Sequence, residues 1–180
     1  MRKTLHLGLI LIFLCFFPLF SSAQDTLSNS LFNLLNTLEP LELRLELDFD
    51  SLEIIKRTNT YLPATLAYKI SKKDWEEWPL QVRARGKFRR IKCDFPPLKL
   101  NFSEKKLKNA GFKPYDEFKL VTHCLQNKAG REVVLREYLI YKLYQVLTDY
   151  SFRVILADIT YKNNQSKNKD RNYGILIEPQ

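Results

Sequence analysis

Hydrophobic and polar residues alternate along several short segments of this chain. The clearest segment is 41–49, in which four leucines and Phe49 share one face while charged residues occupy the other. A period of two predicts a β-strand with one solvated face. The same alternation predicts further strands at residues 61–70, 80–91, 98–102 and 117–123.

The pattern changes to a helical spacing over residues 133–147, where apolar residues recur every three or four positions. Apolar residues also lie on the other side of this segment, which predicts a helix buried on more than one face. Residues 152–161 and 173–177 read as strands joined by the polar loop 162–172, which is a hairpin pattern. The elements together predict an α+β fold: an antiparallel sheet with one long buried helix and a C-terminal hairpin.

The N-terminus carries the three parts of a secretory signal peptide. Arg2 and Lys3 precede the apolar stretch 5–20, and Ser21 and Ala23 are the small residues that a signal peptidase reads. A transmembrane anchor is the alternative. The stretch contains a proline and is shorter than the roughly 20 apolar residues of a spanning helix, which favours cleavage after Ala23.

This interpretation divides the chain into a signal peptide at 1–23, a leader at 24–40 and a folded domain at 41–180. We therefore expect an exported protein, in the periplasm, at the cell surface or secreted. Once the signal is removed, no stable membrane anchor is expected.

Positive charge is concentrated in the middle of the chain. The net charge is +9, and residues 81–119 hold 12 lysines and arginines against 4 acids. Such a face can meet phosphates or an anionic surface, although a solvated strand face has the same composition. We expect no nucleic-acid partner.

Two cysteines, Cys93 and Cys124, remain after signal cleavage. An oxidising compartment allows a disulfide between them, which on the chain-entropy model is worth on the order of 3 kcal/mol. Two unpaired buried thiols are the alternative. His123 beside Cys124 is too little for a zinc site, and a lone histidine at a strand end is more often structural.

No stand-alone catalytic motif is present, but a series of short motifs follows in order. They are Val82–Arg90, Phe95–Phe102, Phe118–His123, Leu135–Leu143, Phe152–Val154 and Tyr173–Glu178. This order resembles the front half of the CotH family, the spore-coat-protein-H kinase-like proteins. The chain departs from the family pattern after Gly86, at Arg136 and Glu137, and in the spacing from Gly174 to Glu178.

The resemblance implies the small lobe of an atypical protein-kinase-like fold, with the catalytic C-terminal lobe absent. The family binds ATP with a divalent metal and transfers phosphate to protein hydroxyls. Its catalytic and metal-binding aspartates lie downstream of the hairpin glutamate, so no catalytic residue is assigned here and the chain is expected to be inactive alone. The residues expected to contact the nucleotide are Arg83, Arg85, Lys99 and Glu137.

Each of these residues also has an ordinary interpretation. Arg83 and Arg85 share a strand face, where they can bind phosphate or only face solvent. Lys99 can contact phosphates or lie exposed at an edge. Glu137 can pair with a lysine such as Lys99, as in kinases, or form a surface ion pair with Lys142.

Two functions of different classes follow. The first is an exported, truncated CotH kinase-like protein whose partner is a protein substrate or the missing C-terminal lobe. The second is an exported β-rich binding module, with a basic strand face for an anionic glycan or protein partner.

Overall fold

The computed structural model describes residues 29–38 and 40–179, so the predicted signal peptide lies outside the described residues. The strands are β1 (Leu41–Leu47), β2 (Leu62–Lys69), β3 (Trp75–Ala84), β4 (Leu98–Phe102), β5 (Glu117–Val121), β6 (Val154–Asn163) and β7 (Lys169–Ile177). The helices are α1 (Leu31–Asn36), α2 (Phe49–Ile55), α3 (Arg89–Lys92), α4 (Glu104–Asn109) and α5 (Lys128–Leu147).

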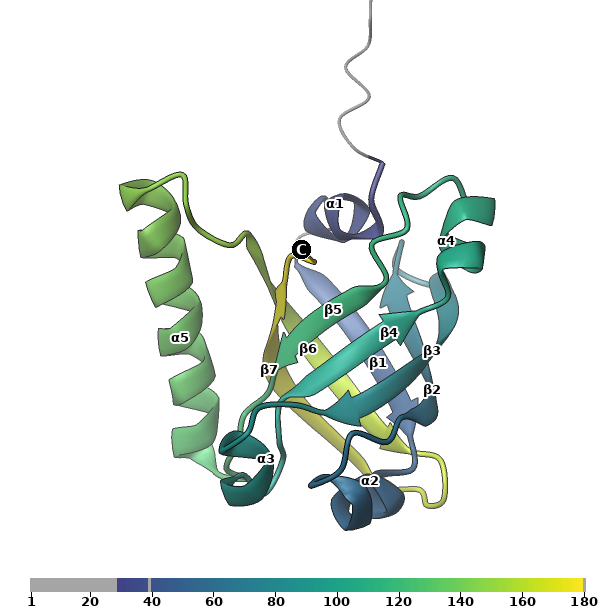
Figure 1. The fold of residues 1–180 in the computed structure, drawn as a ribbon, viewed down its shortest axis with the longest axis vertical. Coiled ribbons are helices and arrows are strands. Elements are labelled where there is room, and N and C mark those ends of the chain that lie inside the picture. Colours follow the sequence, from purple (N-terminus) through teal and green to yellow (C-terminus); the bar gives the residue numbers. More distant parts are fainter. Residues whose placement is uncertain (1–28, 39, 180) are drawn as a thin grey trace, which may run out of the picture.

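The seven strands form one closed barrel in the order β1-β2-β3-β4-β5-β7-β6 (Figure 1). Neighbouring strands are antiparallel except at the closure, where β1 and β6 run parallel with Leu41 opposite Ala157. The predicted α+β layer, an antiparallel sheet like a kinase small lobe, is therefore wrong. A sheet with one apolar face can bury that face by closing on itself, and then needs no second layer to cover it.

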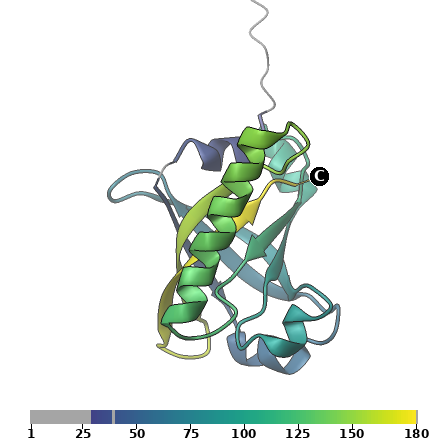
Figure 2. The ribbon, with the colours of Figure 1, turned by 90° about the vertical axis from the view of Figure 1, so that its left-hand side faces the viewer.

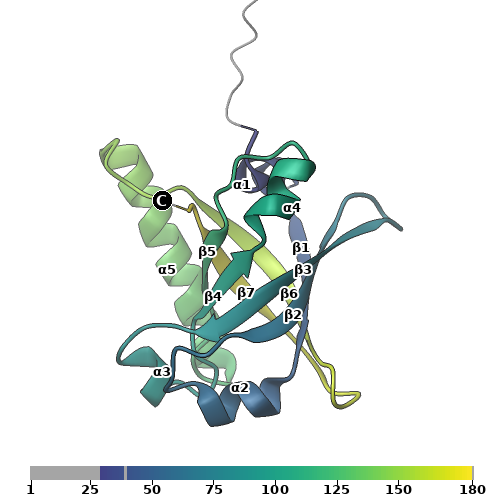
Figure 3. The ribbon, with the colours of Figure 1, turned by 45° about the vertical axis from the view of Figure 1, so that its right-hand side comes forward.

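The barrel interior is filled by the apolar residues that the alternation placed on one face. Leu41, Leu43, Leu45 and Leu47 are all almost completely buried. One end is covered by α1, whose Phe32 and other apolar residues join this core although they lie in the predicted leader. Figure 3 shows α1 and α4 at that end, and α2, α3 and the β6–β7 turn at the other.

The long helix α5 lies along the outside of the barrel (Figure 2). Its contact with the barrel centres on Val134, which packs against Val121, Val154 and Ile175. The predicted burial on more than one face is wrong, because Val146 on the outer side is 83% exposed. The interior is already filled by strand residues, so the barrel offers α5 only its outer surface.

A disulfide joins Cys93 to Cys124, the pairing that the sequence left open. Cys93 follows α3, and Cys124 lies in the connection between β5 and α5. Backbone hydrogen bonding supports the crosslink, since the Phe95 N–H donates to the Cys124 carbonyl at 3.0 Å. The bond therefore fixes the α3 loop against the segment that leads into α5.

Candidate functional site

The predicted basic residues lie on the outer face of the barrel in two different environments. One environment is a row of bases across β3, β4 and β5, where Lys99 lies opposite Arg83 on one side and Lys119 on the other. The Lys99 Nζ lies 2.5 Å from Glu117 Oε2. A hydrogen bond from Lys99 lowers the pKa of Glu117, so this lysine is engaged within its own sheet. Lys99 does not pair with Glu137.

Arg83 is held mainly by the loop before β2. Its guanidinium lies 5.3 Å from the Tyr61 ring centroid and donates to the Ala84 carbonyl at 3.3 Å. It also donates to the Asn59 Oδ1 atom at 3.4 Å. The structure therefore separates Arg83 and Lys99 from the other two predicted residues, Arg85 and Glu137.

Arg85 and Glu137 come together in a groove between the barrel and α5. Arg85 lies just beyond the end of β3, and burial lowers the pKa of its guanidinium. Glu137 projects from α5, and its Oε2 lies 3.3 Å from the Arg89 Nη2. Its ion-pair partner is thus an arginine of α3, rather than either lysine considered from the sequence.

The groove has a basic half and an aromatic half. The basic half is a cavity of about 400 Å³ lined by Arg85, Gly86, Lys87, Phe88, Arg89, Pro97, Val121, Glu137, Tyr141 and Ile177. The aromatic half is a cavity of about 390 Å³ lined by Glu137, Ile140, Tyr141, Tyr144, Tyr150, Ser151 and Phe152. Glu137 and Tyr141 line both cavities, so the two are treated as one site, the α5 groove.

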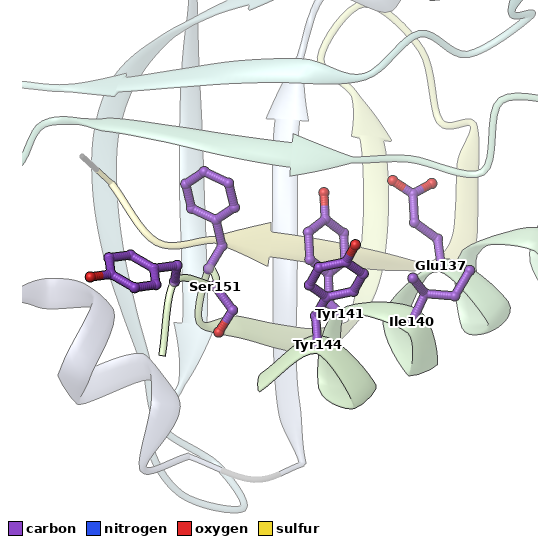
Figure 4. Close-up of a pocket in the computed structure, with 7 residues that line it drawn as sticks. Glu137, Ile140, Tyr141, Tyr144 and Ser151 are labelled. Atoms are coloured by element: carbon purple, nitrogen blue, oxygen red, sulfur yellow. The ribbon is translucent and has the colours of Figure 1, made fainter. Parts of the chain in front are cut away.

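Figure 4 shows how α5 builds the aromatic half, with Glu137, Tyr141 and Tyr144 projecting to the same side of the helix. The opposite wall comes from the segment after α5, including Ser151 and Phe152. Burial raises the pKa of Tyr141, which therefore stays a neutral hydroxyl at physiological pH. This wall was not predicted from the sequence, although the neighbouring aromatic residues Tyr150 and Phe152 indicate an apolar surface after the helix.

Apolar side chains continue from the groove onto the exposed side of α5. Those that are more than half exposed are Val133, Leu139, Ile140, Leu143, Tyr144, Val146 and Leu147. Ile140 and Tyr144 also line the groove, so its aromatic half opens directly onto this apolar surface. Exposed apolar surface of this kind marks interaction sites on folded proteins.

The α5 groove does not fit a metal-bound nucleotide. Its arginines suit the oxygens of a phosphate or a carboxylate equally well. Glu137 is the one carboxylate among the described residues that line it, and Arg89 pairs with it. Within residues 29–38 and 40–179, no group of three or more His, Cys, Asp or Glu is placed to hold a metal ion.

His123 lies away from the groove, in the core near the α2 end of the barrel. Its ring stacks on Phe95 with centroids 4.9 Å apart, and the side chain is almost fully buried. Burial lowers its pKa; of the charges that act on it, Arg131 on α5 reinforces the effect and Asp170 on β7 opposes it. His123 is thus a buried neutral imidazole at neutral pH.

Acidification is expected to destabilise the protein through His123. The pKa of His123 is lower in the folded protein than in the unfolded chain. The free energy of unfolding should therefore be highest above about pH 6.5 and should decrease as the pH falls towards the folded pKa. The slope in that window should reach about 1.4 kcal/mol per pH unit. Denaturant unfolding between pH 7.5 and 5 measures it, and His123→Phe should flatten the curve. Equal slopes for the two proteins would contradict this assignment.

The described helices include none that is long and apolar enough to cross a bilayer. Comparisons of the chain with models of known protein families, with curated proteins and with solved structures find no match. The resemblance to the CotH family therefore stays a prediction.

Proposed function

We propose that this chain is an exported binding module that captures a protein segment in the α5 groove. The segment would present a carboxylate to Arg85 and Arg89, and an adjacent apolar side chain to Tyr141 and Tyr144. The observation that supports this most strongly is the continuity of the groove. The cavity that holds the half-buried Arg85 and the cavity with the aromatic wall are both lined by Glu137 and Tyr141. The Cys93–Cys124 disulfide supports an oxidising compartment.

Charge favours an acidic partner. Three bases, Arg85, Lys87 and Arg89, line the basic half against the single carboxylate of Glu137. Arg85 loses part of its hydration in the groove, as the lowering of its pKa by burial indicates. A carboxylate restores that lost solvation through a forked, charge-assisted pair of hydrogen bonds.

The aromatic half favours a protein over a glycan. Interface centres are enriched in tyrosine and arginine, which dominate binding energy when they are shielded from water. Ile140 offers no hydrogen bond to a sugar, and the exposed apolar residues beside it extend a surface that a protein side chain can cover. A sulfated glycan would contact the basic residues through its sulfates and would leave the aromatic half of the groove unused.

The test is a peptide array in which Asp or Glu flanks Leu, Ile or Phe, followed by fluorescence polarisation on the binders. We expect the double variant Arg85→Ala/Arg89→Ala to weaken binding about tenfold or more, because charge-assisted hydrogen bonds are lost. Tyr144→Ala should weaken it through the aromatic half alone. Raising the salt concentration should weaken the wild type more than the double variant.

Lys72→Ala/Lys73→Ala is the matched control, because it also removes two positive charges, but from the exposed turn before β3. It should bind as the wild type does. An equal loss in this control would reduce the effect to net charge. Two results would overturn the protein-partner proposal: equal binding of peptides that carry serine in place of the apolar residue, or binding of heparin in place of peptide. In either case the binding would depend on Arg85 and Arg89 in the same way and would not depend on Tyr144.

A further inference from the structure

The barrel interior becomes polar at one end. Figure 3 shows α2 and the β6–β7 turn at this end. Pairing in the β6–β7 hairpin places Tyr161 opposite Asp170 and Ile159 opposite Asn172. Tyr161 and Asn172 are both buried, as is His123 at the end of β5. A barrel that needed only a packed core would be apolar at these positions.

A cavity of about 270 Å³ opens at this end. It is lined by Phe49, Phe95, Gln126, Tyr161, Asn163, Asn168, Lys169 and Asp170. None of these residues lines the α5 groove. Barrel mouths are a preferred place for small-molecule sites, and this volume lies just below the range of drug-sized pockets. The cavity is therefore suited to a ligand of about one ring.

Aromatic rings form one wall of the cavity. The Phe49 and Phe95 centroids are 5.4 Å apart, and Phe95 and Tyr161 are 4.8 Å apart. Phe49 also contacts Tyr161 edge-on at 6.1 Å. The three rings support one another and give a rigid apolar surface at the mouth.

The cavity also holds a buried hydroxyl without a partner. Tyr161 is 3% exposed, and its hydroxyl oxygen has no hydrogen-bond partner among the described residues. The Asn172 Oδ1 and both ring nitrogens of His123 are likewise unpartnered, but these two residues do not line the cavity. Buried polar groups are almost always hydrogen-bonded in folded proteins, so the unpartnered Tyr161 hydroxyl favours a polar molecule in the cavity that Tyr161 lines.

We propose that the barrel mouth binds a single neutral sugar ring, either free or at the end of a glycan. The charges at the cavity, Lys169 and Asp170, are balanced, which disfavours a charged ligand. The amides of Gln126 and Asn168 both donate and accept hydrogen bonds, as sugar hydroxyls do. The aromatic wall provides an apolar surface for the C–H face of a ring. This site is independent of the α5 groove.

The test is ligand-observed NMR on the intact protein with glucose, galactose, mannose and N-acetylglucosamine, with glucuronate and glucosamine as charged counterparts. At least one neutral sugar should bind, and Tyr161→Phe, which removes only the hydroxyl, should weaken it about tenfold. The melting temperature of this variant should stay the same or rise, because a buried unpartnered hydroxyl is removed. The methyl glycoside of the bound sugar should bind as well if the natural source is a glycan end.

Tyr173→Phe is the matched control, since Tyr173 lies on the same hairpin but is 39% exposed and does not line the cavity. It should leave sugar binding unchanged. Asn168→Ala tests the rim in a second way and should also weaken binding. Three results would each overturn the proposal: no binding of any neutral sugar, preference for a charged sugar, or equal binding by the wild type and Tyr161→Phe. The first result would mean that water alone hydrogen-bonds to the Tyr161 hydroxyl.

Discussion

Replacing Gly130 with alanine is expected to destabilise the protein by about 3 kcal/mol, the upper end of the usual cost of overpacking. An added Cβ would lie 2.1 Å from the Leu125 carbonyl oxygen and 2.5 Å from that of His123. Both obstacles are backbone atoms beside the disulfide, so they cannot move aside as a flexible side chain can. The first turn of α5 would have to shift away from the barrel.

The steric clash and the helix propensity of alanine predict opposite changes in stability, so the measurement distinguishes them. Gly130 lies inside a helix, where intrinsic propensity alone predicts that alanine stabilises by about 1 kcal/mol. Lys128→Ala in the same turn is the control and should change stability little, because its side chain is exposed. Urea unfolding of the three proteins measures the difference. A Gly130→Ala variant as stable as the wild type would show that α5 does not approach the 123–125 backbone this closely.

Removing the disulfide is expected to have an effect of similar size. Cys93 and Cys124 are 31 positions apart. Opening a loop of that length gives back unfolded-state entropy worth about 3 to 4 kcal/mol on the chain-entropy model. The groove should also suffer, because the crosslink holds the loop of Arg89 against the start of the helix that carries Glu137.

The measurement compares thermal unfolding of the wild type and of Cys93→Ser/Cys124→Ser, each with and without dithiothreitol. Reductant should lower the wild-type melting temperature to that of the double variant and leave the variant unchanged. If reductant shifts both proteins equally, the loss has another cause. Peptide binding in the same samples reports on the groove.

Local patterns located every strand but not all of their bounds, since the predicted strand 80–91 runs into α3 and the predicted loop 162–172 includes the start of β7. They predicted the overall architecture poorly. Alternation located β1 within residues 41–49 because one face of the strand meets the core and the other meets solvent, although Phe49 itself begins α2. Alternation cannot show which strand will be the neighbour of β1, and the parallel pairing with β6 closes the barrel. An open sheet and a closed barrel have the same periodicity, so the fold class was wrong although most elements were right.

The long helix shows a second limit. Its apolar residues were found from their spacing, but spacing does not tell which of them meet the rest of the protein. Val134 faces the barrel and Leu143 does not, because the outer surface of β5, β6 and β7 accepts only a narrow contact. Ile140 and Tyr144, which were expected to be buried, instead line the proposed binding groove and are more than half exposed.

The sequence predicted two residues of the α5 groove, Arg85 and Glu137, but not Arg89 or the aromatic wall. A period of two predicted Arg83 and Arg85 on one face of a strand; Arg83 lies on β3, whereas Arg85 lies just beyond its end. The neighbours that separate the two arginines come from other elements. Lys99 is engaged by Glu117 across a strand pair, and Arg89 reaches Glu137 because the chain turns into α3 after Gly86, at a φ of 84°. Those encounters depend on tertiary structure and left no periodic signal.

The parallel closure has a consequence for how the chain reaches its native state. Glu46 on β1 contacts Lys162 on β6, which lies 116 positions later. During synthesis β1 to β5 therefore emerge with two open sheet edges, and neither edge is covered until the last hairpin is available. Such high contact order makes folding slow and leaves nascent strands prone to aggregation.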